Sequence, residues 1–478
     1  MLSFNSIKDY QSLLHQHKIT CVDALFFYLD NIQKNQHLNA FLEVYTDEAI
    51  NRARKLDADR IAGKQTGKLH GVIIGLKDVI CYKNHKVSAG SKILENFTSV
   101  YSATAVNKLV AEGAIIIGRQ NCDEFAMGSS NENSAYGNVL NSIDTTKVPG
   151  GSSGGSAVSV QAGLCMISLG SDTGGSVRQP ADFCGVVGLK PSYGRVSRYG
   201  LIAYGSSFDQ IGIFAKNLED AKLVLEVISG QDDFDSTSIA EHLSIPISSK
   251  NKPFKIGYFP IMFDHPSLDK EIASTQKQFI GKLNENGIAV SPIDFDLLEY
   301  IVPAYYILTT AEASSNLSRY DGLKYGQSKS SSSLEEQIKL TRSNYFGKEV
   351  KRRIMLGTFV LSEGYYDAYV TQAQKVRTLL LQKIKSIFQE VDALILPVSP
   401  TTAFNIGEKN DDPIAMFLAD IYTVFANLTG IPAISIPLFK HSNGLPFGLQ
   451  LMASHSNELT LLSLSQELVS INKQSISI

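Results

Sequence analysis

The sequence predicts an α/β protein, built as a single large domain around a mixed, mostly parallel β-sheet that helices cover on both faces. From residue 69 onward, short apolar segments alternate with amphipathic segments of helix length. This alternation is typical of strands buried between helices. Hydrophobic residues make up 44% and charged residues 19% of the 478 positions. That balance indicates a globular protein with a large core.

The first part of the chain differs from the rest because it shows only helical periodicity. Leu25, Tyr28 and Leu29 fall at the spacing of one helix face. Neither an internal repeat nor a linker between autonomous domains is recognisable in the sequence. We therefore expect residues 1–64 to form an N-terminal helical segment that packs on a body formed by residues 65–478.

Within the body, strands are expected where short apolar segments lie between turn signals, and helices where capping residues precede helical periodicity. Asn217 illustrates a start signal, because two acidic residues follow it in the first turn of a helical pattern. The expected strands are 71–75, 114–118, 164–169, 210–214, 254–258, 289–292, 393–396 and 433–437. The expected helices are 103–112, 217–229, 267–286, 363–390, 416–429 and 459–471.

Two segments rich in glycine and serine stand out in the first half of the body. They are V-P-G-G-S-S-G-G-S at 148–156 and S-D-T-G-G-S-V-R at 171–178. Such runs are most often flexible linkers. Here apolar segments follow the first run and separate it from the second, whereas linkers do not usually lie between buried segments. Glycine lets a ligand approach the main chain closely, and successive N–H groups can bind an anion. With the hydroxyls of Ser152 and Ser176, the two turns predict an acyl-transfer site.

Two other interpretations of these glycines fit less well. Residues 150–156 lack the Gly-Lys-Ser/Thr ending of a phosphate-binding loop. Residues 151–155 satisfy G-x-S-x-G, which would make Ser153 the nucleophile of an α/β-hydrolase elbow. That elbow follows a strand, whereas residues 141–149 are polar and turn-like.

A serine nucleophile needs a base that accepts its proton. No histidine lies near either turn in the sequence, although a remote one is compatible with it. Lys77 follows an apolar, buried-looking segment, where loss of water would lower the pKa of its amine. A lysine is more often a solvated surface charge, so composition alone does not select Lys77.

Three motifs in this order resemble the amidase signature family. They are G-L-K-D at 75–78, G-G-S-S-G-G-S at 150–156 and S-D-T-G-G-S-V-R-Q-P-A at 171–181. The core of the resemblance covers roughly residues 65–215 and implies an amidase-signature domain.

The resemblance also implies a Ser–Ser–Lys triad. In it Ser176 is the acylated nucleophile, Ser152 relays the proton from a cis peptide after Gly151, and Lys77 takes or holds the proton. The implied oxyanion hole consists of main-chain N–H groups of the turn that holds the nucleophile, namely Thr173, Gly174, Gly175 and Ser176.

Further segments resemble one branch of this family, the A subunits of tRNA-dependent amidotransferases. They are D-E-F-A-M-G-S-S-N-E-N-S at 123–134, A-E-A-S-S-N-L-S-R at 311–319 and F-G-K-E-V-K-R-R-I at 346–354. This resemblance implies that the chain hydrolyses glutamine and supplies ammonia for converting Glu-tRNA(Gln) to Gln-tRNA(Gln), with Asp-tRNA(Asn) as a second possible substrate. It implies a heterotrimer with subunits B and C, in which the partner uses ATP and Mg²⁺ and makes most tRNA contacts. The chain itself is expected to need no metal or cofactor.

Free glutamine carries a carboxylate and an ammonium group, so its site needs a cation and an anion. The resemblance assigns these roles to Arg353 and Asp420. The neighbouring Arg352 is an alternative to Arg353. The resemblance adds the Gly128-Ser129 turn and Tyr305, for which Tyr306 is the alternative, to the binding site.

Composition excludes several other classes of function. A net charge of -3 without a long basic block argues against nucleic acid as the primary ligand. The five cysteines form no C-x-x-C pair, and the nine histidines form no H-E-x-x-H motif, which argues against a zinc site. No apolar run approaches the ~18 residues of a membrane span, and we expect a cytoplasmic protein. The alternative functions are a stand-alone amidase acting on another small amide and an inactive scaffold subunit.

Overall fold

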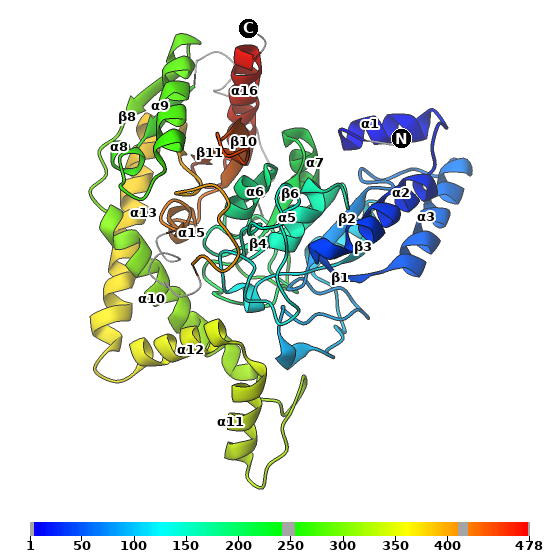
Figure 1. Cartoon of the computed structure of the whole chain (residues 1–478), viewed down its shortest axis with the longest axis horizontal. Helices are drawn as coiled ribbons and strands as arrows, with labels where there is room; N and C mark the ends of the chain where they lie inside the picture. Colours follow the sequence, from blue (N-terminus) through cyan, green and yellow to red (C-terminus); the bar gives the residue numbers. More distant parts are fainter. Residues whose placement is uncertain (1–3, 241–253, 410–418, 477–478) are drawn as a thin grey trace.

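The computed structural model describes residues 4–240, 254–409 and 419–476, and within them eleven strands form one sheet. Across the sheet the strands follow the order β1-β3-β2-β4-β6-β5-β10-β11-β9-β7-β8 (Figure 1). The strands are β1 (Phe41–Val44), β2 (Ile73–Lys77), β3 (Ile115–Gln120), β4 (Ile167–Asp172), β5 (Val187–Lys190), β6 (Gln210–Ala215), β7 (Lys255–Tyr258), β8 (Ala289–Pro292), β9 (Ala393–Leu396), β10 (Ala433–Lys440) and β11 (Pro446–Ala453).

The sheet is mixed, as predicted, but the expected parallel majority is wrong. Among the described residues, four neighbouring pairs are parallel: β2–β3, β2–β4, β7–β8 and β7–β9. The other six pairs are antiparallel and make up the centre of the sheet, from β4 to β9, and its β1 edge. A short apolar run indicates a buried strand but carries no information about its direction, which explains the error.

Helices flank the sheet and form a separate layer at one end of the molecule (Figure 1). α5, α6, α7 and α16 pack directly on strands, while α10 packs on α12 and α13. The longer helices are α1 (Ile7–His15), α2 (Cys21–Lys34), α3 (Thr46–Ile61), α4 (Thr104–Ala111), α5 (Gly154–Gln161), α6 (Arg178–Cys184), α7 (Leu218–Ile228), α9 (Lys270–Glu285), α10 (Leu298–Asn316), α11 (Leu334–Tyr345), α12 (Lys348–Leu361), α13 (Gln372–Glu390) and α16 (Glu458–Ile476). The short helices are α8 (Pro260–Phe263), α15 (Val424–Leu428), η1 (Gln36–Leu38), η2 (Lys92–Leu94), η3 (Glu124–Ala126), η5 (Leu317–Arg319) and η6 (Asp367–Thr371).

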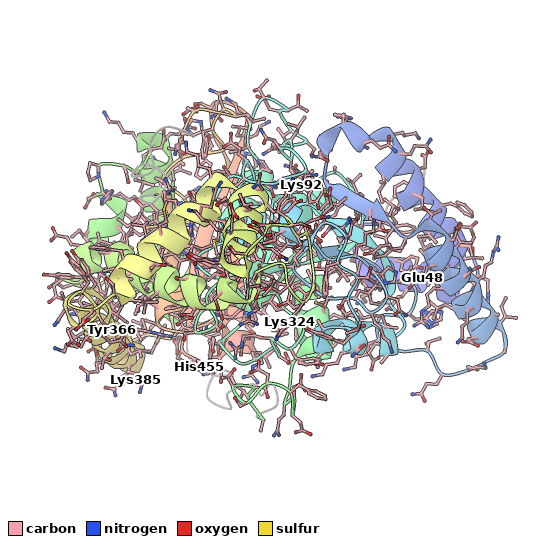
Figure 2. The ribbon with its side chains drawn as sticks, turned by 90° about the horizontal axis from the view of Figure 1, so that it is seen from below. Glu48, Lys92, Lys324, Tyr366, Lys385 and His455 are labelled. Atoms are coloured by element: carbon pink, nitrogen blue, oxygen red, sulfur yellow. The ribbon has the colours of Figure 1, made fainter. Side chains whose placement is uncertain are left out.

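The N-terminal segment contains the expected helices, and their starts follow the local sequence. Ser6 caps α1, and Thr20 with Asp23 forms a capping box at the start of α2. The segment also supplies β1, an edge strand that pairs antiparallel with β3 and that helical periodicity did not predict. Seen from below, Glu48 of α3 and Lys385 of α13 lie at opposite ends of the molecule (Figure 2).

Two predicted helices differ from those observed. The helix expected at 363–390 begins as a π-helical turn, η6, and continues as α13 from Gln372. Of the helix expected at 416–429, the described part of the chain contains α15 (Val424–Leu428) and the single helical residue Ala419, separated by a turn at 420–423, and residues 416–418 lie outside the described residues.

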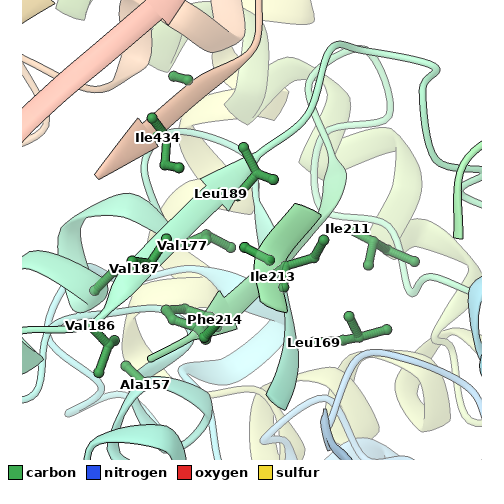
Figure 3. Close-up of a cluster of buried hydrophobic side chains, with 14 of the residues drawn as sticks. Ala157, Leu169, Val177, Val186, Val187, Leu189, Ile211, Ile213, Phe214 and Ile434 are labelled. Carbon is green, nitrogen blue, oxygen red and sulfur yellow. The ribbon is translucent and has the colours of Figure 1, made fainter. Parts of the chain in front are cut away.

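The core around the middle of the sheet is apolar and fully enclosed. Phe214 of β6, Leu189 of β5 and Ala157 of α5 belong to one buried cluster that fills the space between the strands and the helices packed on them (Figure 3). Burying apolar surface of this kind stabilises a fold by about 25 cal/mol for each Å² removed from water. This rigid core fixes the strands whose ends form the site.

Parallel pairing explains why distant motifs meet. β2 lies between β3 and β4 and runs parallel to both, with Leu76 opposite Leu169. The carboxyl ends of parallel strands meet at one edge of a sheet, where ligands commonly bind. β2 ends at Lys77 and β4 ends at Asp172, so the two motifs that follow them share that edge.

Candidate active site

Lys77 is the last residue of β2 and its side chain is fully buried. Its Nζ atom lies 2.7 Å from Ser152 Oγ, 2.8 Å from Ser153 Oγ and 2.9 Å from Ser171 Oγ. The lysine and the first glycine turn, which the sequence placed 75 residues apart, are therefore in direct contact. Lys77 has no carboxylate among its hydrogen-bond partners in the described part of the chain.

The hydroxyl of Ser153 fixes how Lys77 uses its donors. Ser153 Oγ donates to the Ser171 carbonyl oxygen at 3.1 Å, so it can only accept a hydrogen bond from Lys77. A neutral lysine has two N–H donors and one lone pair. Ser152 and Ser171 remain as hydroxyls able to donate to that lone pair, and Ser152 is the closer of the two. The arrangement suits proton transfer from Ser152 to Lys77.

Burial lowers the pKa of Lys77 to about 8, although nearby Cys122, Asp123 and Asp172 act in the opposite direction. Loss of water penalises the charged ammonium form. A base whose pKa lies near neutral pH combines a useful fraction of the free amine with strong proton affinity. Lys77 thus has the ionisation behaviour that a general base needs.

Ser152 follows a cis peptide bond after Gly151, as the resemblance implied. Gly151 donates its N–H to Gln179 Oε1 at 3.0 Å, and Gln179 Nε2 donates to the Ser129 carbonyl oxygen at 2.9 Å. Gln179 therefore joins three loops: the Ser129 turn, the Ser152 turn and the start of α6. The sequence motifs gave Gln179 no role.

Ser176 lies in the turn between β4 and α6, and its side chain is nearly buried. The main-chain N–H groups of Thr173, Gly174 and Ser176 make no hydrogen bond to any described residue. Gly175 differs, because its N–H donates to Asp172 Oδ1 at 2.9 Å. In this structure Gly175 is therefore not available as an oxyanion donor, and the other three N–H groups are.

A buried ion pair holds this turn. Asp172 accepts two hydrogen bonds from Arg178, at 2.9 and 3.1 Å, and a third from the Val177 N–H at 3.1 Å. Burial alone would raise the pKa of Asp172, but the guanidinium of Arg178 outweighs it and holds the pKa far below its usual range. Asp172 stays ionised and keeps the turn closed around Ser176.

A second carboxylate supports the same turn from the other side. Asp209 accepts a hydrogen bond from Thr173 Oγ1 at 2.6 Å and others from the N–H groups of Tyr204 and Gly205. Asp172 and Arg178 lie inside the glycine-rich motif, and their six-residue spacing was a usable signal. Asp209 lies in no such motif, and only the folded chain brings it to Thr173.

The residues expected to bind an amino acid surround this turn. Ser129 Oγ donates to Asp420 Oδ1 at 3.0 Å, and Tyr306 OH donates to Asp420 Oδ2 at 2.6 Å. Burial raises the pKa of Asp420 to about 6, so it is ionised at neutral pH. A carboxylate has about four acceptor positions, which leaves room for an ammonium group beside Ser129 and Tyr306.

Arg353 of α12 is buried on the same side. Its Nε donates to Glu349 at 2.7 Å and its Nη1 to Tyr204 OH at 2.6 Å, while Nη2 makes no hydrogen bond to a described residue. Arg352 also pairs with Glu349, but its side chain is 33% exposed, against 6% for Arg353. Of the two arginines, Arg353 is the one enclosed with Tyr204 and Tyr306, whose rings it faces.

Both tyrosines contact the site, but at different points. Tyr306 holds Asp420, whereas the Tyr305 hydroxyl lies 2.2 Å from the position that a Cβ atom on Gly174 would occupy. Any side chain at Gly174 would therefore collide with Tyr305. Gly128 is constrained in the same way, because a Cβ there would meet the Asp123 carboxylate at 2.4 Å.

Comparison with known proteins shows the family to which the chain belongs. The family model described as Amidase matches residues 23–462. The chain belongs to the amidase family. Among curated relatives, this amidase is 51% identical to the A subunit of the glutamyl-tRNA(Gln) amidotransferase from Koribacter versatilis (strain Ellin345), over 91% of the chain and 92% of the relative.

Two further relatives bear the same name. This amidase is 48% identical to the corresponding protein of Chlorobium phaeobacteroides (strain BS1), over 97% of the chain and 98% of the relative. The crystal structure of the corresponding protein of Thermotoga maritima superimposes with a TM-score of 0.75 at 37% identity, covering 93% of each chain. The sheet and its helices are thus those of an amidase.

Neither a metal-binding cluster nor a membrane-spanning helix is found in the described residues. No group of three or more histidine, cysteine, aspartate or glutamate side chains that could hold a metal ion is present in them. Within the same ranges, every helix is too short or too polar to cross a membrane.

Proposed function

We propose that this amidase is the glutamine-hydrolysing subunit of a tRNA-dependent amidotransferase, with Lys77, Ser152 and Ser176 as its catalytic residues. The observation that carries the proposal is the contact of buried Lys77 with Ser152, beside a turn in which three N–H groups make no hydrogen bond to a described residue. A cation and an anion, Arg353 and Asp420, border that turn and match the charges of free glutamine. Relatives at about half sequence identity bear the name of that subunit.

In the proposed reaction, Ser152 gives its proton to the neutral amine of Lys77 and takes the proton of Ser176. Ser176 Oγ then forms a bond to the side-chain carbonyl carbon of glutamine. The carbonyl oxygen becomes an oxyanion, which the N–H groups of Thr173, Gly174 and Ser176 stabilise. One such donor typically contributes about 3 kcal/mol to the transition state.

The tetrahedral intermediate then breaks its carbon–nitrogen bond. The proton held by Lys77 returns through Ser152 to the leaving nitrogen, so ammonia departs and a γ-glutamyl ester remains on Ser176. Water attacks this ester with the same groups as base and acid, which releases glutamate and restores Ser176. The chain's own residues perform every proton transfer.

The released ammonia is the product that the rest of the enzyme uses. We infer that subunits B and C complete a heterotrimer in which ATP and Mg²⁺ activate Glu-tRNA(Gln), or Asp-tRNA(Asn), for attack by ammonia. The near-neutral charge of this chain supports a division of labour in which a partner makes most tRNA contacts.

Ammonia release tests the proposal. We expect purified protein to release ammonia from glutamine, and its partner subunits with ATP and Glu-tRNA(Gln) to stimulate the release. The Ser176→Ala variant is the blank. Propionamide, which lacks both charged groups of glutamine, is the comparison substrate. Efficient hydrolysis of propionamide that ignores glutamine and the partners would favour the stand-alone amidase instead.

The pH dependence follows from two ionisations in the free enzyme. Catalysis requires the neutral amine of Lys77, whose pKa is about 8, and binding requires the carboxylate of Asp420, whose pKa is about 6. We therefore expect kcat/KM for glutamine to rise most steeply below pH 6, where both groups must lose a proton, to rise about tenfold per pH unit between 6 and 8, and to level off above 8. A profile that falls between pH 6 and 8 would contradict Lys77 as the base.

A further inference from the structure

We propose that Glu124 is a positioning residue that sets the distance between the acyl-transfer centre and the arginine that binds the glutamine carboxylate. The inference rests on the proposed function. Glu124 lies in η3, its side chain is 2% exposed, and it contacts neither Lys77 nor the two serines of the triad. Its carboxylate instead links two parts of the molecule.

On one side, Glu124 contacts the body that holds the triad. Its Oε1 accepts a hydrogen bond from Ser91 Oγ at 2.5 Å. The neighbouring Gly90 donates its N–H to Asp78 Oδ2 at 2.8 Å, and Asp78 directly follows Lys77. The adjacent Asp123 donates its N–H to the Ser152 carbonyl oxygen at 3.1 Å. The segment around Glu124 is thus tied to both ends of the Lys77–Ser152 contact.

On the other side, Glu124 holds the start of the helix that carries Arg353. Its Oε2 accepts the N–H of Gly347 at 2.8 Å. Gly347 is the N-cap residue of α12, and because glycine has no side chain, it makes no side-chain hydrogen bond to the first turn of the helix. A carboxylate there satisfies a free N–H and interacts favourably with the helix dipole. Glu124 therefore supplies the cap that the helix lacks.

The contact leaves little freedom for adjustment. A Cβ atom on Gly347 would lie 2.3 Å from Glu124 Oε2, so the carboxylate fits against a bare backbone. Phe125 packs its ring on Phe346 with centroids 5.7 Å apart, next to the same helix start. α12 packs in turn on α10, where Gly357 lies against the Thr310 carbonyl oxygen. Moving the start of α12 would move Arg353 relative to Ser176.

This arrangement predicts a specific kinetic effect. Without the Glu124 carboxylate, the triad keeps its own contacts but the recognition side loses its fixed position. An error of 1 Å in position can cost ~10²-fold in rate, so we expect Glu124→Ala to raise KM for glutamine about tenfold. The reactivity of Ser176 itself should remain close to that of the wild type.

Three measurements on the full chain test this. The first is kcat and KM for ammonia release from glutamine. The second is the rate at which phenylmethylsulfonyl fluoride sulfonylates Ser176, which needs no amino-acid site. The third is thermal stability. Glu124→Gln keeps an oxygen for the Gly347 N–H and is expected to restore most of the affinity. Ser333→Ala, which removes the cap of the neighbouring helix α11, is the matched control and should leave KM unchanged.

The outcomes separate the inference from the proposed function. A raised KM with near-normal sulfonylation, rescued by Glu124→Gln, supports the inference. An unchanged KM in Glu124→Ala, or equal loss of both reactivities, overturns it. If Glu124→Ala does not fold, Ser91→Ala removes the donor at the body side, and an unchanged KM there overturns the inference too. Wild-type protein that is sulfonylated but releases no ammonia from glutamine would overturn the proposed function and the inference together.

Discussion

Lys77→Met is expected to lower kcat for ammonia release by about 10²- to 10⁴-fold, the range that a general base contributes. Methionine occupies similar volume, so the loss would come from chemistry more than from packing. Ser152 would lose the group that accepts its proton, and Ser176 would lose its route of activation. The measurement is single-turnover ammonia release, with circular dichroism to show that the variant is folded. Folded Lys77→Met with more than a tenth of wild-type turnover would contradict the proposed base.

Lys190 provides a demanding control. It is as fully buried as Lys77, and burial lowers its pKa to about 7. Its Nζ atom, however, donates to the carbonyl oxygens of Pro191 and Ile431 and to Gln210, and none of its hydrogen-bond partners in the described ranges is a serine. We expect Lys190→Met to lower thermal stability while the folded fraction keeps its turnover. Comparing Lys77→Met with Lys190→Met therefore shows whether a lowered lysine pKa is enough for catalysis or whether the lysine must also contact Ser152.

The contrast between these lysines shows what the sequence could predict about the site. Composition gave no reason to prefer Lys77, and its assignment came from the G-L-K-D motif at 75–78. The structure shows why this motif lies at the site. β2 runs parallel to β4, so Lys77, the last residue of β2, lies at the edge of the sheet where the turn with Ser176 begins. The order of the motifs predicted which residues belong to one site, and the direction of the strands brings these residues to the same edge of the sheet.

Residues without a local signal were not predicted. Glu124 and Asp209 act through contacts 223 and 36 positions away, with Gly347 and Thr173 respectively, and neither spacing repeats in the sequence. Gly175 illustrates the opposite case. The family resemblance implied that its N–H is an oxyanion donor, but Asp172 accepts that N–H. A motif identifies a turn, whereas the direction of each N–H depends on partners elsewhere.

Strand direction was one weak point of the predicted fold, and three strands that the sequence did not predict were another. The apolar runs at β5 and β11 were not predicted at all, and β1 was hidden in a segment with helical periodicity. β1 and β5 have four residues each, which is too few for alternation to stand out, whereas β11 has eight residues and was missed despite its length. Long amphipathic segments such as α7 and α9 were located within a few residues, because caps mark their ends.

Arg178→Met is expected to destabilise the fold by about 3–5 kcal/mol, because it leaves a buried charge without its partner. Asp172 and Arg178 are both fully buried, and the arginine also donates to the carbonyl oxygens of Thr423 and of the Asn427 side chain. Urea unfolding followed by tyrosine fluorescence measures the effect, since the chain has 20 tyrosines and no tryptophan. Lys277→Met, at the exposed pair with Asp264, is the control and should cost less than about 1 kcal/mol.

The acid range distinguishes a lost ion pair from lost packing. Asp172 has a lowered pKa in the native state, so its contribution to stability is present above the unfolded value of about 4 and is lost as pH falls further. In Arg178→Met, burial without the guanidinium raises the pKa of Asp172, and protonation then relieves the penalty. The stability difference between wild type and variant should therefore be largest near neutral pH and shrink in acid. A difference independent of pH, or one that Asp172→Asn in the same chain fails to reduce, would show that packing around Arg178, and not its charge, holds the Ser176 turn.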